Sequence, residues 1–177
     1  MPENALWEDA LEHSEWLDSA RENVELMKAR FNDLMLNEQE AEELAGIQNE
    51  IHILVIGTDR CNDTTGNLPV LARMASLSSL VHLRILDSDE NARAHQNYRV
   101  NGKRKTPVVL FLNQNNEELC RWIERPNAAY RTLSEQASNI DDRRDFLKRL
   151  YSDPEILRQS LGELMPLLLR ADYLLQV

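Results

Sequence analysis

Two cysteines are the residues of this 177-residue chain whose chemistry depends most on where they lie. Cys61 comes soon after Ile51–Ile56, a nearly continuous apolar run that ends at Gly57. The turn over residues 57–64 therefore joins a buried strand to the next helix, and it places Cys61 at or near the helix N-terminus. Unpaired backbone N–H groups at that end favour a thiolate, the nucleophilic form of cysteine.

The neighbours of Cys61 in the sequence set its electrostatic surroundings. Arg60 and the basic run Lys103–Lys105 would add positive potential, whereas Asp59 and Asp63 would oppose it. Thr64, three residues after Cys61, carries a hydroxyl group and no thiol. A hydroxyl cannot release a mixed disulfide, but it can donate a hydrogen bond that stabilises the Cys61 thiolate.

Cys120 is the other candidate for redox chemistry. A hairpin turn around Asn115 would place Leu110 opposite Cys120 and Pro107 opposite Ile123. At about 3.3 Å per residue, Cys120 would then lie roughly 10 Å along the strand from the level of Pro107. A disulfide needs Cα atoms within about 7 Å, so Cys120 is predicted to be structural and Cys61 to act alone.

The order of elements from residue 51 onward predicts an α/β fold. Two parallel strands with a helical crossover are followed by a hairpin, so we expect a mixed four-stranded sheet with helices on both faces. The predicted strands cover residues 51–56, 81–86, 107–112 and 118–124, and helices are expected over residues 5–46, 64–79, 89–98 and after Pro126. Asp153-Pro154 is typical of a helix start, and Pro166 predicts a kink or two short helices.

The charge distribution divides the chain further. Residues 1–50 hold 14 acidic and 3 basic residues, although the whole chain has a net charge of only -10. We predict a helical N-terminal extension (residues 1–48), a core (49–138) and a C-terminal helical extension (139–177) that form one compact unit. Nucleic acid is excluded as a general partner, because phosphate binding requires a basic face.

Several other classes of function are not expected. No apolar run approaches the roughly 18 residues that span a bilayer, and the N-terminus lacks a signal peptide, so a cytoplasmic protein without membrane contact is predicted. Four histidines, at positions 13, 52, 82 and 95, show no metal-ligand spacing with each other or with the cysteines. Neither a metal nor another cofactor is expected.

The motifs taken together resemble the thioredoxin superfamily. The loop over residues 57–64 is similar to the active-site loop of that family, Pro69 matches its helix proline, and Thr106-Pro107 matches its cis-proline. A bacterial subgroup with a Cys-Gly-Asp-Cys or Cys-Gly-Asp-Ser loop and a helical N-terminal extension is similar in more detail. The segments that fit it are residues 61–64, 67–69, 84–91, 101–107 and 122–126.

The resemblance implies a thioredoxin-like fold, with Pro107 positioning a substrate beside Cys61 and with Thr106 and Arg60 in the binding surface. Two departures bear on function: Arg60 replaces the usual tryptophan, and Thr64 replaces the second cysteine. The first hypothesis is a monothiol thiol–disulfide oxidoreductase. Its partners would be a protein disulfide, or a mixed disulfide of a protein with a small thiol, and an external low-molecular-weight thiol or reductase. The alternative is a redox-inactive protein-binding or scaffold domain.

Overall fold

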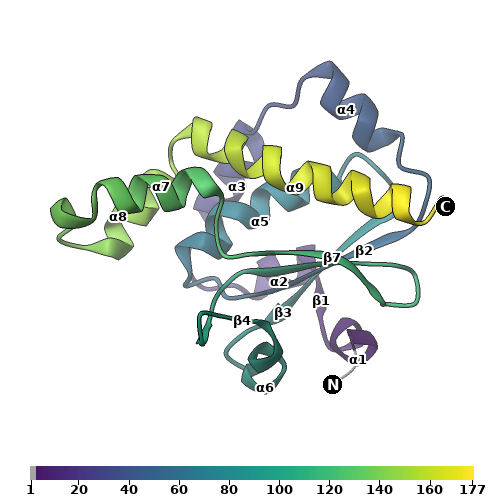
Figure 1. The fold of residues 1–177 in the computed structure, drawn as a ribbon, viewed down its shortest axis with the longest axis horizontal. Helices are drawn as coiled ribbons and strands as arrows, with labels where there is room; N and C mark the ends of the chain where they lie inside the picture. The colour runs from purple at the N-terminus through teal and green to yellow at the C-terminus, as the bar shows by residue number, and fades with distance from the viewer. Residues whose placement is uncertain (1–2) are drawn as a thin grey trace.

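The computed structural model describes residues 3–177 (Figure 1), and among these residues five strands form the main sheet in the order β1-β3-β2-β6-β7. The strands are β1 (Leu11–Glu12), β2 (Ile51–Gly57), β3 (Val81–Asp87), β6 (Val108–Leu112) and β7 (Glu118–Ile123). β2 and β3 are parallel, and the other neighbours are antiparallel. The predicted mixed α/β fold is confirmed, with β1 as a short additional edge strand.

The central strands are buried on both faces, as their continuous apolar sequence predicts. Every residue of β2 and β6 is buried. Because successive side chains of a strand point to opposite faces, β2 serves two cores. Ile53 and Val55 belong to one core, and Leu54 and Ile56 belong to the other.

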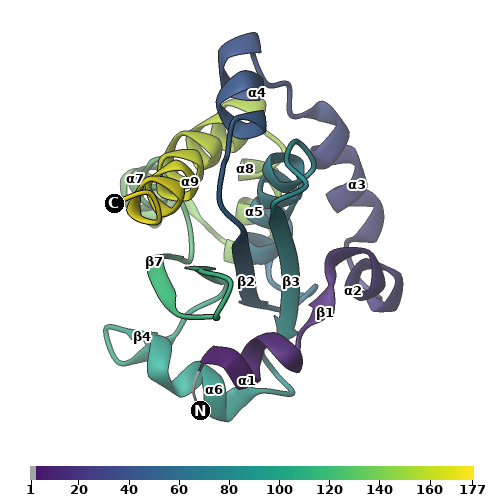
Figure 2. The same cartoon turned by 90° about the vertical axis from the view of Figure 1, so that its right-hand side faces the viewer.

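Helices cover both faces of the sheet (Figure 2). The larger core lies under α3 (Val24–Asp33), α5 (Asn62–Ala75) and α9 (Pro154–Leu174), and the smaller one lies under α1 (Glu3–Glu8), α6 (Ala92–His95) and the short 3-10 turn Gln96–Tyr98. The connection β2-α5-β3 is the crossover that two parallel neighbouring strands require. It delivers the N-terminus of α5 to the carboxyl end of β2.

The N-terminal extension is mainly helical but not wholly so. It contains α1, α2 (His13–Ser19), α3 and α4 (Glu38–Ala45), and α4 begins at Asn37 with a capping box to Glu40. The sequence predicted only helices here, whereas Leu11 pairs with Ile85 across β1 and β3. A strand of two residues is too short to show the alternation of side chains that distinguishes a strand from a helix in a sequence. β1 therefore forms because β3 offers it a free edge to pair with.

α7 (Asn127–Glu135) closes the segment predicted as the core, and the C-terminal extension comprises α8 (Arg143–Leu150) and α9. Asp153 caps α9 through the backbone N–H of Glu155, at 2.9 Å, and Pro154 occupies its first turn, as predicted. The helix continues through Pro166, so two short helices do not form. Leu164 and Leu168 are fully buried on the side of α9 that faces the core, and this packing holds the helix together across the proline.

The β6–β7 hairpin differs from the prediction by one residue in register. Cys120 lies opposite Phe111, and Val108 lies opposite Ile123, with an irregularity between Phe111 and Leu112. The turn before β7 includes Asn116 in the left-handed region, with φ at 60°. A turn with that geometry changes the register, which alternation of residue types alone does not specify.

A second, two-stranded sheet forms within the basic loop. β4 (Arg99–Val100) and β5 (Lys103–Arg104) pair across Asn101 and Gly102, whose φ angles are 49° and 70°. Positive φ at both central residues is the geometry that Asn-Gly favours in a tight hairpin.

Within residues 3–177, no helix is long and apolar enough to cross a bilayer.

Candidate active site around Cys61

Cys61 lies at the position predicted for it, at the junction of β2 and α5. It is the N-cap residue of α5, a helix of 14 residues, and it is partly exposed. Its Sγ donates to the carbonyl oxygen of Thr106 at 3.6 Å, and the peptide bond between Thr106 and Pro107 is cis. The structure therefore brings together the two segments that the sequence analysis placed in one site.

The close approach of α5 to the end of β2 requires the glycine at position 57. A Cβ atom on Gly57 would lie 2.7 Å from Cγ2 of Thr64, a distance that packed atoms do not adopt. Thr64 itself is fully buried. The side chain of Thr64 thus fills the space between the first turn of the helix and the strand that leads to Cys61.

The predicted hydrogen bond from Thr64 to Cys61 is absent from this structure. The Oγ1 atom of Thr64 is buried and has no hydrogen-bond partner among the residues described. The thiol instead uses the backbone carbonyl of Thr106. In this structure Thr64 contributes packing to the site, and its hydroxyl is not paired with the sulfur.

The N-terminal extension holds the loop that precedes Cys61. The carboxylate of Asp59 accepts the backbone N–H groups of Arg21 and Glu22 at 2.7 and 2.9 Å. The side-chain amide of Asn23 donates to the carbonyl oxygen of Asp59 at 2.8 Å. The link between α2 and α3 is therefore anchored to the active-site loop.

Two of the basic groups predicted to surround Cys61, Arg60 and Lys105, are paired with carboxylates. Arg60 is exposed and forms an ion pair with Asp89, which raises the pKa of its guanidinium. The Lys105 ammonium lies 2.7 Å from Glu124. Both cations are thus largely compensated, and the positive end of α5 remains as a source of stabilisation for a thiolate.

A buried ionic cluster that the sequence analysis did not identify lies directly behind Cys61. Asp63 and Arg125 are in contact at 2.6 Å, and Arg125 also contacts Glu124 at 2.6 Å. Glu124 accepts further hydrogen bonds from Lys105 and Tyr130, and these partners lower its pKa against the opposing effect of burial. The cluster joins the first turn of α5 to the segment that follows β7.

The C-terminal extension completes this cluster through Tyr151. Its hydroxyl donates to Asp63 at 2.7 Å and accepts from the side-chain amide of Asn67 at 3.1 Å. The ring lies directly over Gly66, where an added Cβ would be 2.3 Å from a ring carbon. Gly66 is the residue that lets Tyr151 approach the backbone of α5.

Burial dominates the protonation of Asp63. Desolvation raises the pKa of its carboxyl group to about 6, even though Arg125 and Tyr151 both favour the charged form. Sequence reasoning missed this cluster because Arg125 and Tyr151 are 62 and 88 residues away from Asp63. The adjacent charged residues Glu124 and Arg125, directly after β7, were the available signal.

Cys120 is remote from this chemistry, as predicted. Its Sγ donates to the carbonyl oxygen of Leu167 in α9 at 3.4 Å, and burial raises the pKa of its thiol to about 11. Cys61 and Cys120 are both free thiols. Cys120 thus packs β7 against α9 and forms no disulfide with Cys61.

The histidines do not form a metal site. Within residues 3–177, no three His, Cys, Asp or Glu side chains are arranged to hold a metal ion. His52 stacks on Trp7, with ring centroids 4.2 Å apart, and its ring nitrogens contact Asn116 and Glu50. His95 contacts the carbonyl oxygen of Lys105 at 2.7 Å and so helps to hold the segment before Pro107.

Comparisons with known proteins agree with this architecture. A solved protein of unknown function from Pseudomonas aeruginosa is 18% identical, with a TM-score of 0.74 and coverage of 94% of this chain and 96% of that one. An HIV epitope-scaffold protein is 21% identical, with a TM-score of 0.68 and coverage of 94% and 97%. At these identities the likeness concerns the fold alone. None of the curated proteins matches the chain.

The family comparison covers both segments of the candidate site. The family model described as Thioredoxin matches residues 10–138, which include Cys61 and the cis Thr106-Pro107 bond. The match extends over most of the chain and spans every strand of the main sheet. The chain belongs to the thioredoxin family.

Proposed function

We propose that this protein is a monothiol thiol–disulfide oxidoreductase that acts through Cys61. The observation that carries the proposal is the placement of the Cys61 sulfur at the N-terminus of α5, 3.6 Å from the carbonyl oxygen that precedes the cis Pro107. Helix N–H groups stabilise a thiolate at that point. The backbone beside Pro107 offers pairing groups to an extended peptide that carries the target disulfide.

The reaction proceeds in two exchanges because Thr64 cannot supply a second thiol. The Cys61 thiolate attacks a mixed disulfide between a protein and a small thiol. A new disulfide forms between Cys61 and the small thiol, and the protein sulfur leaves as a thiolate. A second small thiol, acting as its thiolate, then attacks that disulfide, releases the two small thiols as their disulfide and regenerates the Cys61 thiolate. The external thiol is thereby oxidised, and the protein substrate is reduced.

The loop sequence supports a finer assignment within the family. Cys61-Asn62-Asp63-Thr64 is similar to the Cys-Gly-Asp-Cys and Cys-Gly-Asp-Ser loops of a bacterial subgroup. A reducing cytoplasm supplies the low-molecular-weight thiol that the second exchange consumes, so we place the protein there. We assign no cofactor, metal or nucleic acid to the reaction.

The test uses a protein carrying glutathione in a mixed disulfide as substrate and glutathione as the external thiol. The wild-type protein should speed release of glutathione from the substrate, and C61S should abolish the acceleration. C120S is the matched control and should retain it. Mass spectrometry of the wild type without free glutathione should detect the disulfide between Cys61 and glutathione.

Two results would reject the enzymatic proposal. One is an equal rate with wild type and C61S, and the other is no acceleration by the wild type with this substrate. Either result would favour the redox-inactive binding domain, whose partner capture should not change on Cys61→Ser substitution.

A further inference from the structure

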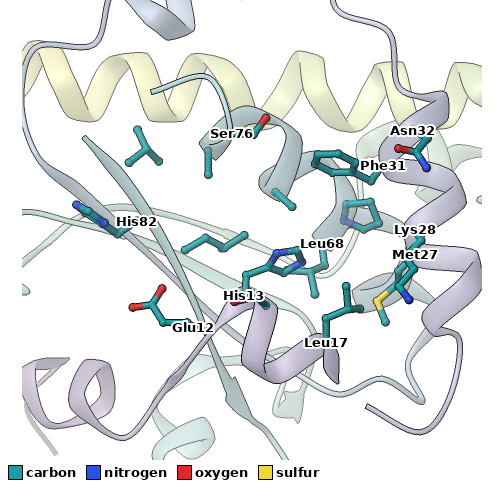
Figure 3. A pocket seen from close by; sticks show the side chains of 16 residues that line it. Glu12, His13, Leu17, Met27, Lys28, Phe31, Asn32, Leu68, Ser76 and His82 are labelled. Atoms are coloured by element: carbon teal, nitrogen blue, oxygen red, sulfur yellow. The ribbon is translucent and has the colours of Figure 1, made fainter. Parts of the chain in front are cut away.

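A cavity separate from the Cys61 site lies under the N-terminal extension. It has a volume of about 600 Å³ and is formed by β1, α2, α3, α5 and β3 (Figure 3). Its apolar walls include Leu17 of α2, Met27 and Phe31 of α3, and Leu68 and Ala75 of α5. None of its lining residues belongs to the Cys61 loop or to the Thr106-Pro107 segment. Its size falls in the range of sites for small organic ligands.

The half-buried side chain of His13 enters this mainly apolar space. The imidazole of His13 extends from the start of α2 toward Leu68 in α5 (Figure 3). His13 forms no hydrogen bond or ion pair with any residue in the described part of the chain. Burial lowers the pKa of His13, so its imidazole is neutral at pH 7 and has one nitrogen to donate and one to accept.

The charged residues at the rim already have partners. Glu12 lies 2.8 Å from Arg84, and Lys28 lies 3.4 Å from Glu25. The surrounding extension is strongly acidic, with 14 acidic and 3 basic residues over positions 1–50. An anionic ligand would therefore be repelled, and a cationic ligand would find no unpaired carboxylate among the lining residues.

We propose that this cavity binds a neutral, mainly apolar small molecule with one hydroxyl group that hydrogen-bonds to His13. The apolar body fits the walls from α2, α3 and α5, and the hydroxyl satisfies the imidazole that the chain leaves unpartnered. An alkylphenol has this combination of groups. The site is independent of the disulfide chemistry proposed for Cys61.

The experiment compares three probes of the same shape: 4-butylphenol, butylbenzene and 4-butylbenzoate. Binding to the isotopically labelled full-length protein is followed by ¹H–¹⁵N NMR shifts. We expect 4-butylphenol to bind with a Kd on the order of 0.1 mM, with shifts confined to α2, α3 and α5. Butylbenzene should bind about fivefold more weakly, since it lacks the hydrogen bond, and 4-butylbenzoate should bind more weakly still.

Two variants locate the interaction. His13→Leu should remove the preference for 4-butylphenol over butylbenzene while retaining binding of both. Ala75→Phe should fill the cavity and weaken binding of both at least tenfold, with the remaining NMR spectrum unchanged. No binding of 4-butylphenol would overturn the proposal, as would equal affinity for all three probes in the wild type. A preference for 4-butylphenol that survives in His13→Leu would do the same.

Discussion

The carboxylate of Asp63 lies 2.6 Å from the guanidinium of Arg125, and their side chains are only 5% and 4% exposed. Asp63 is two residues from Cys61 in the first turn of α5, and Arg125 follows β7. An ion pair in such a place is costly to form, because both charges lose their hydration, and more costly to break. The geometry behind Cys61 therefore depends on Asp63 and Arg125 remaining in contact.

Removing one partner should show this dependence. Arg125→Met leaves Asp63 buried with only the Tyr151 hydroxyl as a side-chain donor, and we expect the free energy of unfolding at pH 7 to fall by about 3 kcal/mol. Urea denaturation measures the change. Arg144→Met, which breaks an exposed pair with Glu22, is the control and should cost less than about 1 kcal/mol. Equal losses in the two variants would contradict the role given to burial.

The raised pKa of Asp63 predicts a pH-dependent stability. Its carboxyl group has a pKa of about 6 in the folded state, compared with 3.8 for the ordinary group. Between these values the folded state binds more protons than the unfolded state. This contribution to stability is therefore full below about pH 4 and is lost as the pH rises through 6.

Asp63→Asn isolates this effect, because the variant has no proton to exchange at that position. The stability of the wild type relative to Asp63→Asn should fall by roughly 2.5 kcal/mol between pH 4 and pH 7, because a tenfold difference in proton affinity between the folded and unfolded states corresponds to about 1.4 kcal/mol. Denaturation curves at several pH values give the difference. A difference that stays constant, or that rises with pH, would show that Arg125 outweighs desolvation.

Gly66 and Tyr151 should be energetically coupled. A methyl group at position 66 would lie 2.3 Å from the Tyr151 ring, so Gly66→Ala should destabilise the protein by about 2 kcal/mol even though alanine favours a helix. The double variant with Tyr151→Leu should recover part of the loss attributable to Gly66→Ala, and a double-mutant cycle measures the recovery. Strictly additive losses would indicate that α5 moves away from the ring instead.

Whether a feature of this molecule could be predicted from the sequence depends on how far apart in the chain the residues that determine it lie. The apolar runs of β2 and β6 predict central strands because these strands are buried on both faces. The turn that follows β2 then places Cys61 at the start of α5. Both inferences use neighbouring residues only, and both are met by the structure.

Features set by distant partners were not predictable in this way. The pairing of Asp63 with Arg125 and Tyr151, and the His13 cavity, depend on segments that meet only after folding. The hairpin register depends on the left-handed Asn116, and the continuity of α9 depends on packing that outweighs Pro166. Periodicity and propensity do not report such contacts.

The two cysteines should differ sharply in reactivity. Burial against α9 raises the pKa of Cys120 to about 11, so on the order of one molecule in 10⁴ carries its thiolate at pH 7. Cys61 is at a helix N-terminus and partly exposed. Iodoacetamide at pH 7 should therefore alkylate Cys61 at least tenfold faster than Cys120, as measured by site-resolved mass spectrometry. Comparable alkylation rates would contradict the inference that the N-terminus of α5 stabilises the Cys61 thiolate.

Substitution of Thr64, whose hydroxyl is buried, distinguishes an effect on packing from an effect on the reactivity of Cys61. Its Oγ1 atom has lost water and gained no partner among residues 3–177, a loss that is worth about 1–3 kcal/mol. Valine has nearly the same shape without the hydroxyl, so Thr64→Val should raise the free energy of unfolding by about 1 kcal/mol. Because the sulfur of Cys61 pairs with Thr106 and not with Thr64, the alkylation rate of Cys61 should stay within twofold of the wild-type rate. Slower alkylation in Thr64→Val, with Thr64→Ser unaffected, would instead show that the hydroxyl turns to the sulfur once the thiolate forms.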